Sequence, residues 1–143
     1  NNMSNSLIVG CLKVGMQISV ACPEKYPFDP RILEFAKAYE GFRLTTDPRA
    51  AAQGADVLET DVWASMGDEG EAEQRRRDFA GYQINGDLLA LAKPDCMVLH
   101  CLPAHRGEEI TAEAFESHAD QIFDEAENRL HAQKAVLVSC MGA

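Results

Sequence analysis

The stretch from Phe42 to Trp63, FRLTTDPRAAAQGADVLETDVW, contains two strand patterns separated by a short helix pattern. FRLTTD predicts the first strand, and Asp47 and Pro48 then supply the N-cap and first turn of a helix that Gly54 ends. DVLETDVW follows as the second strand. Strands joined by helices over such short connections indicate an α/β domain with a mostly parallel sheet.

The same alternation continues on both sides of this stretch. Toward the N-terminus we expect a helix around Leu7–Leu12, a strand in MQISVACP and a helix from Asp29 to Gly41. Toward the C-terminus we expect a solvated helix in DEGEAEQRRRDF, a helix capped by Asn85, a strand in CMVLHC and a final helix from about Glu125 to Met141. The final helix carries one stripe, made of Ala126, Leu130, Gln133, Leu137 and Cys140. These patterns predict an α/β fold in which a Rossmann-like parallel sheet has helices on both faces.

Charge and composition exclude several classes of partner. Thirteen Lys and Arg stand against 23 Asp and Glu, so the net charge of −10 would repel nucleic acid. No apolar run approaches the roughly 20 residues of a membrane helix, and the opening NNMSNSLIVG lacks the basic start of a signal peptide. Five cysteines, an odd number without a CxxC pair, favour free thiols in a reducing compartment. We therefore expect a soluble, cytoplasmic protein with no nucleic acid or membrane partner.

Polar residues stand where two of the predicted strands end. DVWASMG begins at Asp61, directly after one strand, and HCLPAHRGEE begins at His100, at the end of another. Ligands of parallel α/β sheets bind beyond the carboxyl ends of the strands. Asp61 could simply cap the turn that follows. A carboxylate, the Ser65 hydroxyl and a nearby backbone N–H would also suit an amino acid, with the acid and hydroxyl holding the ammonium and the N–H groups holding the carboxylate.

Other chemistries find less support in the sequence. No GxGxxG follows a strand and no GxxxxGK[ST] occurs, so a nucleotide site is disfavoured. Cys96, His100, Cys101 and His105 could be drawn as a metal set, but strand alternation turns His100 and Cys101 to opposite sides. We expect no metal and no cofactor, and we expect His100 to be packed behind the site rather than to act as a base. Cys101 alone is more typical of a core residue, although its place at a strand end before Leu-Pro favours a role in a site.

Four motifs, in the order NNMSNS, DVWASMG, HCLPAHRGEEI and DEAENR, resemble the motifs of the ornithine carbamoyltransferases. The resemblance extends from the Asn pair to the final helix, and it implies that residues 1–143 form the ornithine-binding half of such an enzyme. This family transfers a carbamoyl group from carbamoyl phosphate to the δ-amino group of L-ornithine, which gives L-citrulline and phosphate. The resemblance further implies a homotrimeric, cytoplasmic enzyme of arginine metabolism.

The resemblance also assigns roles to particular residues. Asn2 and the backbone around Met66 would hold the carboxylate of ornithine, while Asp61 and Ser65 would hold its α-ammonium. Cys101 and the carbonyl of Leu102 would face the δ-nitrogen and the carbamoyl group. Arg129 would help to polarise the carbamoyl oxygen. The HCLP and SMG sequences favour free ornithine over the aspartate, putrescine or acylated ornithine used by related carbamoyltransferases.

Some features of the family do not occur in this chain. The Ser-Thr-Arg-Thr-Arg loop and the His-Pro-x-Gln segment of the carbamoyl phosphate domain are absent, as is the central strand that leads into the Asn pair. We therefore expect a partial ornithine-binding domain, without its first strand and without the carbamoyl phosphate-binding domain, and we interpret the chain as a fragment of a longer enzyme. An amino-acid-binding α/β module without catalysis is the alternative from a different class.

Overall fold

Side-chain caps start the helices where the sequence predicts them. The computed structural model describes residues 1–64 and 69–142. Asp29 accepts a hydrogen bond from the N–H of Arg31 at the start of α2, and Asp47 does the same for Arg49 at the start of α3. In both helices proline follows the cap, at a position whose N–H has no intrahelical partner. Helix α2 spans Pro30–Ala36 and α3 spans Pro48–Ala52. A third helix, α5 (Gly86–Leu89), is capped by Asn85 in the same way.

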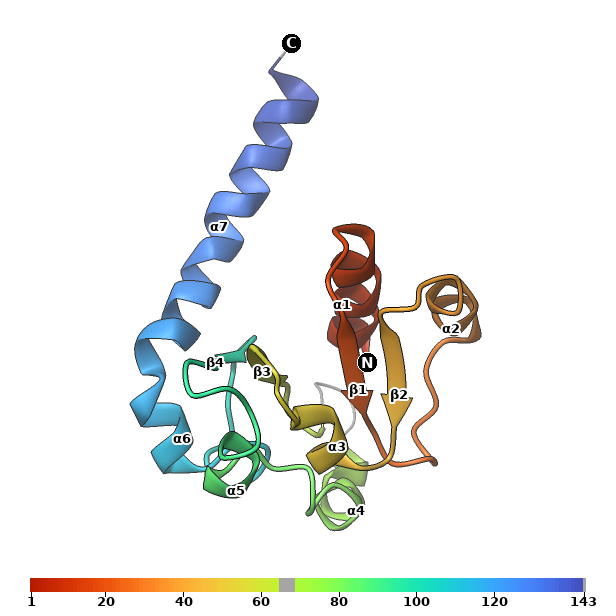
Figure 1. Ribbon diagram of the computed structural model, residues 1–143. Helices are drawn as coiled ribbons and strands as arrows, with labels where there is room; N and C mark the ends of the chain where they lie inside the picture. The colour runs from red at the N-terminus through yellow and green to blue at the C-terminus, as the bar shows by residue number, and fades with distance from the viewer. Residues whose placement is uncertain (65–68, 143) are drawn as a thin grey trace.

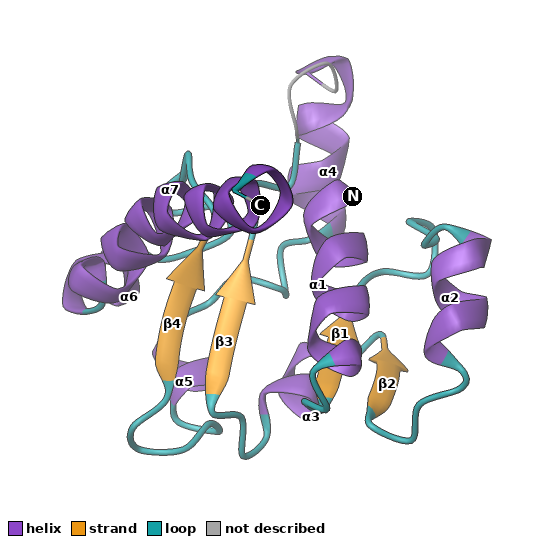
Figure 2. Ribbon diagram, turned by 90° about the horizontal axis from the view of Figure 1, so that it is seen from above, coloured by secondary structure: helices purple, strands orange, loops and turns teal. Residues whose placement is uncertain are grey.

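Four short strands form two parallel pairs. β1 (Ile18–Ala21) pairs with β2 (Phe42–Thr45), and β3 (Val57–Thr60) pairs with β4 (Met97–His100). The two pairs stand side by side (Figure 2). A groove of about 700 Å³ is lined by residues of β1, β3 and the helix that opens the chain. The α/β prediction is confirmed, and the described strands form two separate parallel pairs with no hydrogen-bonded ladder between β1 and β3.

Each strand pair has a hydrophobic core of its own. Helices α1 (Asn2–Lys13) and α2 pack beside β1, and there Ile8, Leu12 and Ala36 are buried. The other cluster surrounds β4 and comprises Ile84, Val98, Ile110, Ala114, Phe115 and Ile122. Full burial of one such aliphatic side chain contributes about 1.5–3 kcal/mol. The two pairs are therefore anchored separately, and their carboxyl ends are placed by different sets of contacts.

Two further elements lie between β3 and β4, and a third follows β4. A 3₁₀ turn, Glu69–Glu71, leads into α4 (Ala72–Asp78), in which Glu71 pairs with Arg75 and Glu73 with Arg77 as predicted. Helix α6 (Ala112–Ser117) was not predicted, although Thr111 caps it by accepting from the N–H of Ala114. It is too short to show a helical period in the sequence.

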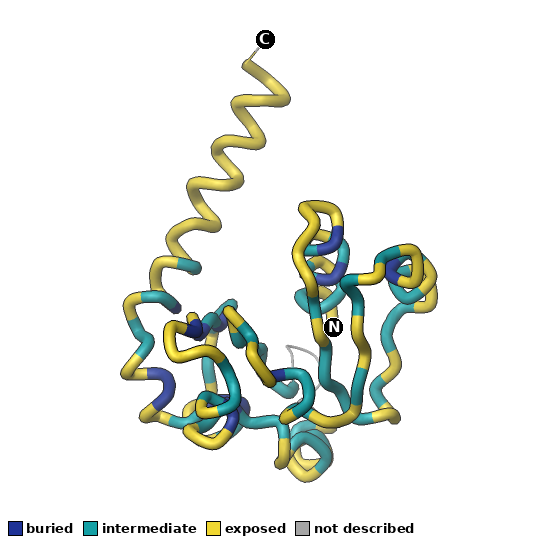
Figure 3. Tube along the Cα trace, in the orientation of Figure 1, coloured by how far each residue is buried: buried dark blue, intermediate teal, exposed yellow. Residues whose placement is uncertain are grey.

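The final helix, α7 (Ala119–Met141), begins six residues before the predicted Glu125. Its first turns pack against β4, and there Ile122 is buried in the hydrophobic core. The second half extends away from the rest of the chain (Figure 1) and is exposed throughout (Figure 3). Leu130 and Leu137 of the predicted stripe are 55% and 56% exposed, so the stripe has no partner in the described part of the chain. No helix among the described residues is long and apolar enough to span a membrane.

Candidate functional site

The candidate site lies where β3, β4 and the first residues of the chain meet. Asp61 follows β3 directly, and Cys101 follows β4 directly. The parallel register places Thr60 opposite His100, so the two residues that come next lie at the same edge. The Asp61 carboxylate interacts with the Cys101 side chain. The topology thus brings together the two strand ends that the sequence singled out.

The N-terminal Asn1 reaches this edge as well. Its Nδ2 donates to Oδ2 of Asp61 at 2.7 Å. Its Oδ1 accepts from the N–H and hydroxyl of Ser4, which caps α1. Asn2, which the resemblance assigned to the substrate carboxylate, lies next to it in the first turn and is exposed. The sequence analysis missed Asn1, although an asparagine before an apolar helical face is an N-cap signal.

Asp61 has the capping role that the sequence left open, and its second oxygen faces another residue of the edge. Its Oδ1 accepts from the N–H of Val62 at 2.8 Å, so it does stabilise the turn after β3. Its Oδ2 faces Asn1 and the site. One oxygen therefore holds the backbone, and the other is available for a ligand that displaces or supplements the amide of Asn1.

Cys101 is a protonated thiol at this site. Burial raises its pKa to about 12, and the carboxylates of Asp61, Glu59 and Glu125 add to the effect because a thiolate would be repelled by them. A thiol with so high a pKa is a poor nucleophile, because the thiolate is the reactive form. The raised pKa of Cys101 accordingly disfavours a covalent intermediate at its sulfur.

Behind Cys101, His100 organises the turn that follows β4. Its ring is fully buried, and its Nδ1 accepts from the N–H of Leu102 at 2.9 Å. The neutral ring therefore carries its proton on Nε2, which donates to Oε1 of Glu109 at 3.0 Å. Leu102 has φ of +52°, a left-handed conformation that is uncommon for a residue other than glycine. The prediction that His100 is packed rather than an exposed base is confirmed, and its contact holds Leu102 in this strained conformation.

Glu109 is a buried carboxylate that depends on few partners. Its Oε1 accepts from His100 and from the N–H of His105 at 2.6 Å, while its Oε2 is buried with no partner among the described atoms. Burial alone would raise its pKa, but the hydrogen bonds from His100 and His105 outweigh burial and lower the pKa below its usual value. The carboxylate therefore stays charged inside the protein.

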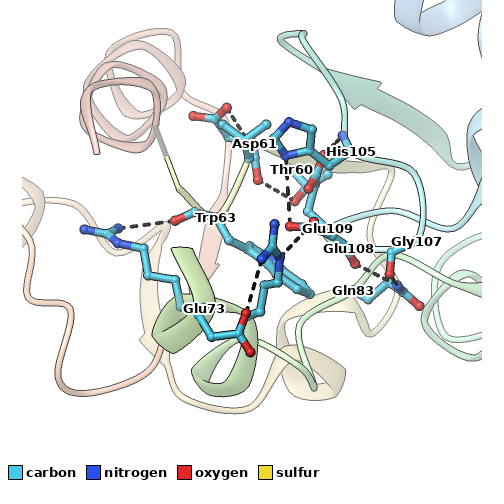
Figure 4. Close-up of polar contacts among 12 residues, drawn as sticks. Thr60, Asp61, Trp63, Glu73, Gln83, His105, Gly107, Glu108 and Glu109 are labelled. Atoms are coloured by element: carbon cyan, nitrogen blue, oxygen red, sulfur yellow. Dashed lines mark hydrogen bonds and ion pairs between the residues drawn. The ribbon is translucent and has the colours of Figure 1, made fainter. Parts of the chain in front are cut away.

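The loop that contains Glu109 is held by further polar contacts (Figure 4). Gln83 donates to the carbonyl oxygens of Gly107 at 2.9 Å and Glu108 at 2.7 Å, and Arg76 donates to Glu108 at 2.9 Å. One described group could supply metal ligands: a ring nitrogen of His105 and carboxylate oxygens of Glu108 and Glu109 lie within 4.8 Å of one another. Arg76 already neutralises Glu108, so we assign this group to the loop's own polar network.

A third acid, Glu59, faces the same edge from within β3. Its pKa is raised to about 7, first by burial and then by the negative charges of Glu125 and Asp61. The pKa of Glu125, on α7, is also raised by burial. Asp61 lies beside the thiol, and Glu59 adds its charge above about pH 7, so this edge is acidic and attracts cationic ligands.

The pKa of Glu59 predicts a dependence of stability on pH. The folded protein holds a proton on Glu59 up to about pH 7, whereas the unfolded chain loses it near the ordinary value of 4.5. The contribution of Glu59 to the free energy of unfolding is therefore full below pH 4.5 and is lost as the pH rises through 7. In Glu59→Gln this loss is absent, so at pH 8 the variant should be more stable than the parent by about 1–2 kcal/mol, discounted for partial exposure. Urea unfolding of both proteins at pH 5 and pH 8 measures this difference; an equal change with pH in both would contradict it.

The remaining predicted site residues are placed as follows. Ser65 and Met66 lie outside the described residues. Leu102 follows Cys101 at the site edge, with a cis peptide bond to Pro103. Arg129 lies on α7, one turn beyond Glu125, and is exposed without a hydrogen bond or ion pair to any described side chain. Among the described residues, the structure thus brings Asp61 and Cys101 together, with Leu102 next to Cys101 in the chain, and shows Arg129 exposed on α7.

Fold and site define a Rossmann-like α/β domain with an acidic edge where β3 and β4 end. Residues 1–140 match the sequence profile described as "Aspartate/ornithine carbamoyltransferase, Asp/Orn binding domain". The chain belongs to the aspartate/ornithine carbamoyltransferase family, which confirms the resemblance seen in the four motifs.

Individual relatives agree with the family assignment. The ornithine carbamoyltransferase of Methanosarcina acetivorans is 53% identical over 142 residues, which cover 99% of this chain and 47% of that protein. The structure of anabolic ornithine carbamoyltransferase from Campylobacter jejuni aligns with a TM-score of 0.90 at 42% identity, covering 96% of this chain and 47% of that one. That of Pyrococcus furiosus aligns with 0.86 at 50% identity, over 94% and 45%. The chain spans about half the length of the curated relatives it matches.

Proposed function

We propose that this chain forms the ornithine-binding side of an ornithine carbamoyltransferase. The observation that carries the proposal is the carboxylate of Asp61, set between the amide of Asn1 and the thiol of Cys101 at the carboxyl edge of β3 and β4. Ornithine carries two amino groups and one carboxylate, so an acidic edge with amide and thiol groups complements it. The carbamoyl phosphate-binding domain, in this proposal, is supplied by residues other than these 143.

In the proposed complex, each group at the edge has a defined task. Asp61, with Ser65, holds the α-ammonium, and Asn2 with the backbone around Met66 holds the carboxylate. Cys101 and the carbonyl of Leu102 then face the δ-nitrogen. The strained turn of Leu102, supported by His100, aims that carbonyl at the reacting end.

The reaction requires the δ-amine to be neutral, because only its lone pair can attack. The nitrogen forms a bond to the carbamoyl carbon, the bond from that carbon to the phosphate oxygen breaks, and phosphate leaves with the electron pair. The nitrogen loses a proton to solvent or a site carboxylate. During attack, negative charge develops on the carbamoyl oxygen, and the guanidinium of Arg129 is the group that stabilises it.

Cys101→Ser tests this proposal in a protein that joins these residues to the carbamoyl phosphate-binding domain. We expect kcat/KM for ornithine to fall about tenfold, since a hydroxyl is smaller than a thiol and packs less well against substrate; a contact of this kind contributes about 1–1.5 kcal/mol. Steady-state citrulline formation is the measurement. Cys140→Ser, at the exposed end of α7, is the matched control and should leave kcat/KM unchanged.

Two other outcomes would separate the alternatives. Equal kcat/KM in Cys101→Ser and the parent would overturn the role of the thiol. Binding of ornithine by calorimetry without any citrulline formation would support the binding module that lacks catalysis.

We further infer that the whole protein is a cytoplasmic homotrimer that acts in arginine metabolism. The support for the compartment is that all five cysteines are unpaired in the structure, as in reducing surroundings. The assembly and the pathway rest on the family resemblance.

A further inference from the structure

The outer edge of β4 is covered by two side chains of α7. Gln121 accepts from the N–H of Val98 at 2.9 Å, and Glu125 accepts from the N–H of His100 at 2.8 Å. The opposite edge of β4 pairs with β3. Both donors belong to fully buried residues, where an unpaired N–H is costly. Gln121 and Glu125, named here the edge clamp, therefore take the place of a neighbouring strand.

The spacing of the edge clamp determines how α7 sits on β4. Residues four apart on a helix are separated by about 6.0 Å along its axis. Residues two apart on a strand are separated by about 6.6 Å. Gln121 and Glu125, four residues apart on α7, reach two donors that are two residues apart on β4, so the two hydrogen bonds together select one register. A shift of α7 by one residue rotates its side chains by about 100° and breaks both hydrogen bonds.

Arg129 continues the line that the edge clamp begins. Gln121, Glu125 and Arg129 are four residues apart in succession, so they share one face of α7. The hydrogen bonds of the clamp end at His100, and Arg129 is the next residue on the same face, one turn beyond Glu125.

Few other contacts could position this part of α7. The buried residue of α7 is Ile122, and beyond Glu125 every described residue of the helix is exposed. Among the described residues, the last contact of α7 before Arg129 is therefore the hydrogen bond from His100 to Glu125.

We propose that Gln121 and Glu125 are positioning residues, which hold α7 in the register that presents Arg129 to the carbamoyl oxygen. This inference rests on the proposed function. The contact needs an acceptor oxygen rather than a charge, so an amide at position 125 preserves it and an aliphatic side chain removes it.

Two variants at position 125 and a control test the edge clamp in the protein that carries both domains. In Glu125→Gln, kcat for citrulline formation should stay within about threefold of the parent. In Glu125→Leu, kcat should fall about 10- to 100-fold with KM for ornithine within about threefold, because a misplacement of about 1 Å can cost a hundredfold in rate while Asp61 and Cys101 keep their places. Glu127→Leu, on the exposed side of the same helix, should behave like the parent.

The same substitution in an Arg129→Ala background separates positioning from general damage. If the edge clamp acts through Arg129, Glu125→Leu causes no further loss of kcat once Arg129 is absent. An equal loss in both backgrounds would overturn the proposal. Should Glu125→Leu fold poorly, Gln121→Leu removes the other contact, farther from the site, and should lower kcat in the same direction.

Hydrogen exchange gives a readout that does not depend on activity. The amide of His100 should be protected in the parent and in Glu125→Gln and should exchange at least tenfold faster in Glu125→Leu. Unchanged protection would show that the edge clamp does not exist. If the parent makes no citrulline, the proposed function and the role toward Arg129 fail together, while the exchange rates still decide whether Glu125 holds the edge of β4.

Discussion

Asp61→Asn is expected to lower kcat/KM for ornithine by about a hundredfold in the two-domain protein. The amide keeps the shape of the carboxylate and can still accept from the N–H of Val62, so the turn after β3 should persist. What is lost is the negative charge opposite the α-ammonium, and removing one partner of a buried charge pair costs about 2–5 kcal/mol. Citrulline formation at varied ornithine concentration measures the effect, which should appear mainly in KM.

Asp56→Asn provides the control for charge alone. Asp56 lies just before β3, is exposed, and pairs with Lys93 at the surface. Its replacement removes the same charge at the opposite end of β3, away from the site, so kcat/KM should change by less than about twofold. Equal effects of Asp56→Asn and Asp61→Asn would mean that Asp61 acts only through the overall potential or the turn.

His100→Ala is expected to lower the free energy of unfolding by about 3–5 kcal/mol. The substitution removes one of the two donors to Oε1 of Glu109 and leaves a buried carboxylate without its ring partner, which costs about this much. Urea denaturation at pH 7 measures it. His131→Ala, on the exposed part of α7, should change the free energy by no more than about 0.5 kcal/mol.

The pair can be examined further with a double substitution. Glu109→Leu removes the buried charge itself, so His100→Ala combined with Glu109→Leu should be less destabilised than the sum of the single variants. Strict additivity would show that the two residues contribute independently and would contradict the account of Glu109 as a charge that depends on His100.

Local sequence signals were sufficient for much of the fold. Asp29, Asp47 and Asn85 cap helices because the capping hydrogen bond spans only two or three residues. Asp61 and Cys101 were identifiable because strand ends converge in a parallel sheet. The start of α7 was placed too late, since the pattern followed the apolar stripe, whereas the part of the helix that packs against β4 is centred on Ile122.

Other features depend on contacts that no local pattern contains. Asn1 and Asp61 are 60 residues apart, and Glu125 is 25 residues from His100. The sequence shows that Gln121, Glu125 and Arg129 share a helix face, but it does not show that this face meets the edge of a strand. The pairing of His100 with Glu109 was hidden for a similar reason, because the turn between them brings the side chains together only once the loop is folded.

Beyond the contact of Glu125 with β4, no described residue of α7 is buried, so a rigid second half of the helix would pivot about that contact. Arg129 lies about 6 Å beyond that point and Met141 about 24 Å beyond it, at 1.5 Å per residue. A tilt of about 10° would thus displace Arg129 by about 1 Å and the tip of the helix by about 4 Å. A displacement imposed at the far end of α7 would therefore be about four times larger than the resulting displacement of Arg129. A movement of about 4 Å at the tip would shift the guanidinium by only about 1 Å.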